Sequence, residues 1–118
     1  MRKIIYLFLL GLIFPLSDGA QTSAISIKEP ELTYKLFQNY PNPFNPTTSV
    51  RYTIPAEGHV SLKVFNALGV EVADLVDSVK PAGDYVVEFN GENLASGIYF
   101  LQLKAGGYIN IKKMILLK

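Results

Sequence analysis

The sequence predicts an all-β protein: an immunoglobulin-like antiparallel β-sandwich of about seven strands, preceded by a signal peptide. Turn-forming residues recur every eight to twelve positions from Leu32 onward, which is the spacing expected between the strands of a sandwich or barrel. Apolar and polar residues alternate between these turns, as they do in strands with one buried face. No segment has a convincing helical period, and no internal repeat is visible.

The N-terminal residues have the pattern of a secretory signal peptide. Arg2 and Lys3 precede an uncharged apolar run from Ile4 to Phe14, which Pro15 ends. That run is shorter than the roughly 20 apolar residues that span a bilayer. A buried core helix is the alternative, but no helical partner follows in the sequence. We therefore expect the chain to be exported.

The residues after this run indicate the domain boundaries. Small residues allow cleavage after Gly19 or after Ala24. The following residues are polar and have no sustained period, so they are expected to form a linker. The predicted organisation is a signal peptide and cleavage region at 1–24, a linker at 25–31 and a sandwich domain at 32–118.

Composition limits the chemistry of the exported domain. The absence of cysteine excludes a disulfide framework, a thiol nucleophile, a zinc–thiolate site and a lipid-anchored cysteine, so the domain must be stable by burial alone. Loss of Arg2, Lys3 and Asp18 with the signal peptide leaves nine basic and nine acidic residues. That balance does not favour nucleic acid or an anionic membrane as the main partner. No acidic residue follows Glu92, so the C-terminal part is locally positive.

Seven segments are expected to be strands, each bounded by a turn. They are a short one near 34–38 and longer ones at 50–54, 59–65, 70–76, 84–89, 98–104 and 108–118. Turns are expected at 55–58, 66–69, 80–83, 90–97 and 105–107, where proline, asparagine or glycine occur. The residues expected to face the core are Val50, Tyr52, Ile54, Val60, Leu62, Val64, Tyr85, Val87, Phe89, Tyr99, Leu101 and Leu103.

A proline- and asparagine-rich segment, "NYPNPFNP" at residues 39–46, directly precedes the first long strand. Proline donates no hydrogen bond and forces the preceding residue into extended geometry, while asparagine side chains can hydrogen-bond their own backbone. We expect a rigid connection around one end of the sandwich, with Phe44 in the core. The alternative is a peptide that a partner binds. Asn42-Pro43-Phe44 is also the tripeptide bound by EH-type adaptor modules of the eukaryotic cytosol, which an exported chain does not meet.

The sequence shows little that could carry catalysis. His59 is the only histidine and is expected at the surface, and no serine-hydrolase motif accompanies it. Asp74, Asp77 and Asp84 flank a loop, but their spacing matches no calcium loop, so they are expected to be solvated turn residues. No glycine pattern opens a helix to hold phosphate. We conclude that the chain is not an enzyme and needs no metal or cofactor.

The alternation of apolar and polar residues is interrupted in the C-terminal strand. Ile109 and Ile111 share one face, yet Lys112 and Lys113 are adjacent and 114–117 are apolar on both faces. One interpretation is a bulge at the lysines, with the last residues folded into the core. The other is a basic pair and an apolar strand that are offered to a partner by strand addition.

Several stretches together resemble a known family. They are "LFQNYPNPFNPTTSVRYTIP", "VSLKVFNALGVEVADLV", "AGDYVVEFNGENLASGIYF" and the terminal "KKMILLK". They closely resemble the C-terminal sorting domain of the type IX (Por, gliding-associated) secretion system of gram-negative bacteria, type A, over about 32–118. More distantly, the middle of the chain resembles the immunoglobulin-like domain of flagellar hook-capping proteins.

The resemblance implies a non-catalytic sorting signal. Such a domain directs an exported protein through the periplasm and the type IX outer-membrane translocon to the cell surface, with transient outer-membrane contact. A sortase-like peptidase would cut in the linker between Ser23 and Leu32. The implied translocon-recognition residues are Gly106, Gly107, Lys112, Lys113, Met114, Ile115, Leu116, Leu117 and Lys118. The family's entry motif corresponds to Pro41, Asn42, Pro43, Phe44, Asn45 and Pro46.

One departure from the family keeps alternatives open. In the family the domain ends a long cargo protein, whereas here it follows the signal peptide almost directly. A second hypothesis is therefore a stand-alone structural or adhesive immunoglobulin-like module, and one form of it is a remnant of a larger secreted protein. A third, an enzyme, would need activity that depends on His59 or on the three aspartates.

Overall fold

The computed structural model describes residues 31–118, which form one compact unit. The predicted signal peptide, its cleavage region and nearly all of the predicted linker lie outside these residues. The strands within the described range are β3 (Lys35–Leu36), β4 (Thr47–Ile54), β5 (Gly58–Asn66), β6 (Glu71–Lys80), β7 (Gly83–Asn90), β8 (Gly97–Ala105) and β9 (Tyr108–Leu116). No helix in this range is long and apolar enough to cross a membrane.

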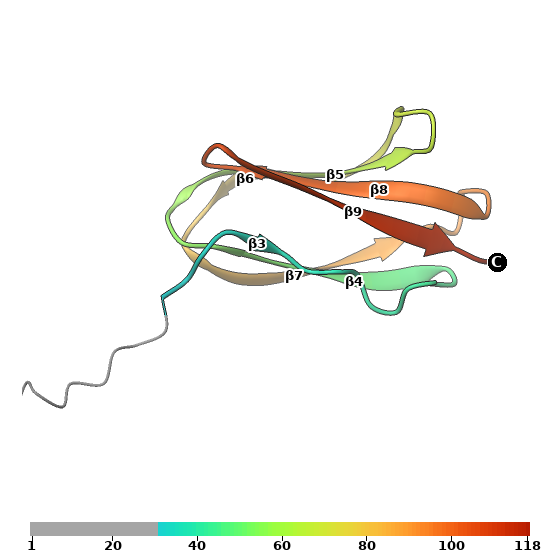
Figure 1. The fold of residues 1–118 in the computed structure, drawn as a ribbon, viewed down its shortest axis with the longest axis horizontal. Coiled ribbons are helices and arrows are strands. Elements are labelled where there is room, and N and C mark those ends of the chain that lie inside the picture. Colours follow the sequence, from blue (N-terminus) through green and yellow to red (C-terminus); the bar gives the residue numbers. More distant parts are fainter. Residues whose placement is uncertain (1–30) are drawn as a thin grey trace, which may run out of the picture. The chain divides into compact units, whose positions relative to one another are not determined.

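The strands form two sheets that face each other as the layers of a sandwich (Figure 1). One sheet has the order β3-β4-β7 and the other has the order β6-β5-β8-β9. The pairings within both sheets are antiparallel. The predicted all-β sandwich of about seven strands is thereby confirmed, including the short first strand.

Alternation of apolar residues builds the core between the two sheets. Successive side chains of a strand point to opposite faces, so β4, β5 and β8 each place every second residue inside. The fully buried members of the core are Leu36, Phe44, Val50, Tyr52, Ile54, Val60, Leu62, Val64, Leu101, Leu103, Met114 and Leu116. Of the residues predicted to face the core, Tyr85 and Val87 are only partly buried, because β7 lies at an edge of its sheet.

The hairpin between β8 and β9 has a two-residue turn formed by Gly106 and Gly107. Their φ angles are 54° and 82°, and a turn with two positive φ angles matches the twist of paired strands. A Cβ on Gly106 would also lie 2.0 Å from the Tyr34 hydroxyl. Tyr34 in turn stacks on Tyr108 at 5.4 Å. Glycine at position 106 is therefore favoured by the positive φ of the turn, and it leaves room for the Tyr34 ring where that ring now lies.

Tyr52 is a polar residue inside the apolar core. Its side chain is buried and its ring stacks on Tyr85 at 5.2 Å. Within residues 31–118 its hydroxyl has no hydrogen-bond partner. Burial raises the pKa of Tyr52, and the charge of Tyr85 raises it further, because an apolar environment disfavours the phenolate.

Replacement of a central core residue should be costly. Leu103 is fully buried on β8, so Leu103→Ala should lower the free energy of unfolding by about 2–5 kcal/mol through lost burial and a cavity. The control is Leu68, which is 88% exposed. Leu68→Ala should change the free energy of unfolding by about 0.5 kcal/mol or less. Urea denaturation measures both, and equal effects would contradict the assigned core.

Removal of the Tyr52 hydroxyl should not destabilise the fold and should reduce its alkaline sensitivity. An unpaired buried hydroxyl contributes no net stability. Because the pKa of Tyr52 is raised in the folded state, its hydroxyl ionises first in the unfolded chain, so the free energy of unfolding falls as pH rises from the unfolded pKa of about 10 to the folded value. Tyr52→Phe should flatten the fall in stability above about pH 10, measured by urea denaturation. Tyr40→Phe, at a position 81% exposed, is the control and should leave that fall unchanged.

Candidate functional site

The entry motif (Pro41–Pro46) and the end of β9 lie side by side, although more than 70 residues separate them in sequence. The Phe44 N–H donates to the Ile115 carbonyl oxygen at 2.9 Å, and the Leu117 N–H donates to the Phe44 carbonyl oxygen at 3.0 Å. These two bonds form a parallel bridge between Phe44 and Leu116. The entry motif therefore continues the four-stranded sheet beyond β9.

Side chains extend this pairing toward the middle of β9. The Asn42 Oδ1 accepts from the Ile115 N–H at 2.9 Å, and its Nδ2 donates to the Lys113 carbonyl oxygen at 3.5 Å. The Gln38 Nε2 donates to the same carbonyl oxygen at 2.8 Å. The entry motif and Gln38 thus pair with the outer edge of β9, from the Lys113 carbonyl to the Leu117 amide that follows the strand.

The asparagines of the segment do not all act as expected. Asn39 bonds its neighbouring backbone, because its Nδ2 donates to the Pro41 carbonyl oxygen at 3.0 Å, and it also reaches the Thr48 hydroxyl at 3.0 Å. Asn42 instead bonds the distant strand β9. Asn45 is exposed and makes no hydrogen bond to residues 31–118 with its side chain. Of the three asparagines, only Asn39 makes the local backbone bond considered for this segment, and the distant partner of Asn42 is not visible in local sequence.

Phe44 fastens the entry motif to the core, as predicted. Its ring is buried, lies 5.9 Å from the Phe89 ring and is tilted by 57° to it. A Cβ on Gly91 would lie 3.1 Å from Leu116 and 3.4 Å from the Phe44 ring. The Gly91 N–H also donates to the Pro46 carbonyl oxygen at 2.8 Å. Gly91 therefore allows the close approach of motif and strand, a role that its position in an expected loop did not indicate.

The bulge considered at the two lysines is absent. β8 and β9 pair without interruption from Gly97 with Leu116 to Ala105 with Tyr108. Met114 and Leu116 consequently point into the core, whereas Lys113 is exposed on the opposite face and Lys112 is partly buried. The apolar end is therefore divided: alternate residues anchor the strand, and those between them face outward.

Lys118 and the hairpin glycines, which also belong to the predicted recognition residues, lie at opposite ends of β9. Lys118 contacts the connection between β7 and β8, where its N–H donates to the Ser96 hydroxyl at 3.0 Å and its Nζ donates to the Leu94 carbonyl oxygen at 2.9 Å. Gly106 and Gly107 lie at the other end of β9, which at about 3.4 Å per residue is roughly 30 Å away. The structure brings the entry motif together with 113–118 but not with the hairpin.

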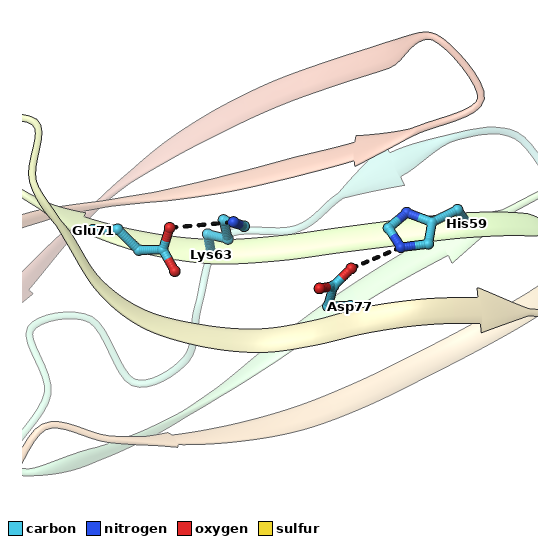
Figure 2. Close-up of polar contacts among 4 residues, drawn as sticks. All are labelled: His59, Lys63, Glu71 and Asp77. Atoms are coloured by element: carbon cyan, nitrogen blue, oxygen red, sulfur yellow. Dashed lines mark hydrogen bonds and ion pairs between the residues drawn. The ribbon is translucent and has the colours of Figure 1, made fainter.

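Two polar side-chain pairs join β5 and β6 on the outer face of the four-stranded sheet (Figure 2). The His59 Nε2 lies 2.7 Å from an Asp77 carboxylate oxygen, and the Lys63 Nζ lies 3.2 Å from a Glu71 carboxylate oxygen. The hydrogen bond to Glu71, together with the charge of that carboxylate, raises the pKa of Lys63. Both pairs line a shallow groove of about 730 Å³. The pairing of His59 was not anticipated; it follows from the register of β5 and β6, which brings Ser61 opposite Asp77.

The three aspartates considered for calcium do not meet. Asp74 and Asp77 lie on β6, whereas Asp84 lies on β7 in the other sheet. Asp84 accepts a hydrogen bond from Thr53 and lies 3.7 Å from the Arg51 guanidinium. Within residues 31–118 no three acidic or histidine side chains are placed to hold a metal ion.

The Asn42 bonds to β9 can be tested against a matched asparagine. Asn42→Ala removes the acceptor of the Ile115 N–H, so it should lower the free energy of unfolding by about 1 kcal/mol and speed amide exchange at Ile115. Asn45→Ala, also before a proline but without a bond to β9, should do neither. Urea denaturation and amide exchange measure the two effects, and equal behaviour of both variants would contradict the assigned bond.

Comparison with known proteins identifies the family of the chain. A family described as "Secretion system C-terminal sorting domain" matches residues 38–117, which include the entry motif and all of β9. No curated protein matches the chain. The match identifies a sorting signal for type IX secretion, and it implies export to the cell surface or the extracellular space. The chain belongs to the family of type IX secretion C-terminal sorting domains.

Proposed function

We propose that the type IX translocon recognises a composite site, formed by the entry motif (Pro41–Pro46) and Lys112–Lys118. The observation that carries the proposal is the pairing of these two segments through Phe44 and Asn42. A receptor that contacts one of them therefore also meets the other. It would recognise a folded surface and not a free C-terminal peptide.

Residues of the composite site would have two kinds of role. Phe44, Met114 and Leu116 are buried, so they position the site from within the core. The outward residues are available for contact: Pro41, Pro43, Asn45, Lys113, Leu117 and Lys118 are exposed. Because no acidic residue follows Glu92, the lysines give this end a positive surface that suits a receptor with acidic groups.

Two further elements belong to the proposal through the family resemblance. Gly106 and Gly107 would make a separate contact, because they lie at the far end of β9 from the entry motif. A sortase-like peptidase would cut between Ser23 and Leu32 after passage through the periplasm. Leu32 is exposed and precedes β3, which supports access for a peptidase at that end of the segment.

The proposal is tested by surface delivery of a reporter in a host with the type IX system. A signal-bearing reporter fused to 32–118 should reach the cell surface, and deletion of 112–118 should leave it in the periplasm. Because the deletion also removes core residues Met114 and Leu116, Lys113→Glu is the sharper variant. It should reduce delivery by about tenfold through charge reversal at an exposed contact, while urea denaturation shows an unchanged fold.

The matched control for that variant is Lys35→Glu, an exposed lysine on β3. It should leave delivery unchanged. Normal delivery by the Lys113→Glu and deletion variants would refute the role of the composite site, and it would favour a structural or adhesive module whose sorting does not depend on this strand.

A further inference from the structure

We propose that the unpaired half of the β9 edge binds an extended strand of a partner protein, and that this strand carries carboxylate side chains. The surface is formed by Ile109 and Ile111 on the edge, with Phe65 and Phe100 beside them on the outer face of the sheet. It adjoins the composite site at Lys113, and the inference does not depend on what the translocon recognises. We call it the open-edge surface.

The backbone of β9 provides the first argument. Its odd-numbered residues direct their N–H and C=O groups away from β8, because Ile115 and Leu117 use those groups to bond the entry motif. Ile109 and Ile111 have the same orientation by alternation. Within residues 31–118 their outward groups have no hydrogen-bond partner. The chain therefore completes its own edge beyond Lys113 and leaves the preceding part able to pair with another strand.

The side chains provide the second argument. Ile109 and Ile111 are 59% and 52% exposed, although both are large and apolar. Ile111 also lines a hollow of about 350 Å³ together with Phe65, Gly69, Phe100 and Gln102. An apolar hollow beside an open strand edge is the arrangement that strand addition uses: backbone bonds hold the incoming strand, and the hollow takes one of its side chains.

Charge decides what kind of strand fits. Lys104 pairs with Ile109 across the β8–β9 ladder, and Phe100 pairs with Lys113, so both lysines flank the apolar patch on the same face. The edge strands β6 and β7 carry carboxylates instead, at Glu71, Asp74, Asp77, Asp84 and Glu88. A partner strand with carboxylates complements β9 and is repelled by the edge strands β6 and β7. A second copy that paired through the same edge would bring like charges together.

Binding can be measured with a synthetic probe and the chain purified after export. The probe is a ten-residue peptide in which valine and glutamate alternate, and a valine–lysine peptide is its counterpart. The acidic peptide should slow amide exchange at Ile109, Ile111 and Lys113 by about tenfold. It should bind at least about tenfold more tightly than the basic peptide, with an affinity that falls as salt rises.

Matched substitutions locate the interaction. Ile111→Glu should abolish binding of the acidic peptide by adding a like charge to the edge. Val86→Glu should not, although Val86 is 66% exposed and lies on β7, an edge strand of the other sheet. Lys104→Glu should weaken binding of the acidic peptide and strengthen binding of the basic one.

Several outcomes would overturn the inference. They are no binding, protection of β6 or β7 amides in place of β9, and equal effects of Ile111→Glu and Val86→Glu. Protection at Ile109 and Ile111 that depends on the protein's own concentration would assign the edge to a second copy, and it would overturn the inference as well. Surface delivery measures the composite site separately, so failure of one proposal is distinguishable from failure of the other.

Discussion

The pairing of Phe44 with Leu116 is the interaction on which the rest of the structure depends. An edge strand presents a row of unpaired N–H and C=O groups, which must find partners or remain solvated. Here the entry motif supplies partners with its backbone at Phe44 and with the side-chain amide of Asn42. Proline suits the segment because it offers few amides of its own. The pairing also directs Phe44 and Leu116 into one apolar cluster.

This arrangement ties the residues of the proposed composite site to the stability of the domain. Along the end of β9, alternate residues are core members, and those between them face solvent. An exposed lysine is therefore held in place by its buried neighbours Met114 and Leu116. Loss of these buried anchors would displace the exposed residues, although the anchors are not at the surface. Charge reversal of an exposed residue separates recognition from folding, and truncation does not.

The two halves of the β9 edge differ in chemistry as well as in pairing. The C-terminal half is covered by the chain itself, and the N-terminal half combines open backbone groups with exposed isoleucines. Lysines lie along this edge, whereas carboxylates lie along β6 and β7. Charge of one sign at an edge suppresses pairing with copies of the same edge and selects partners of the other sign. The distribution of charge therefore gives one edge of the sandwich a distinct specificity.

Local patterns in the sequence determined the fold class, the strands, the turns and most of the core. The alternation of apolar and polar residues and the glycine or proline turns each involve only a few neighbouring residues. They can therefore be recognised in the sequence without tertiary information. Three features depended on the tertiary structure alone. They are the hydrogen bond between Asn42 and Ile115, the close packing that Gly91 allows, and the unbroken strand pairing at Lys112 and Lys113. The first two features join segments far apart in the chain, and the third belongs to the hairpin between β8 and β9. No local propensity specifies them, because they arise only when both sheets close over a shared core.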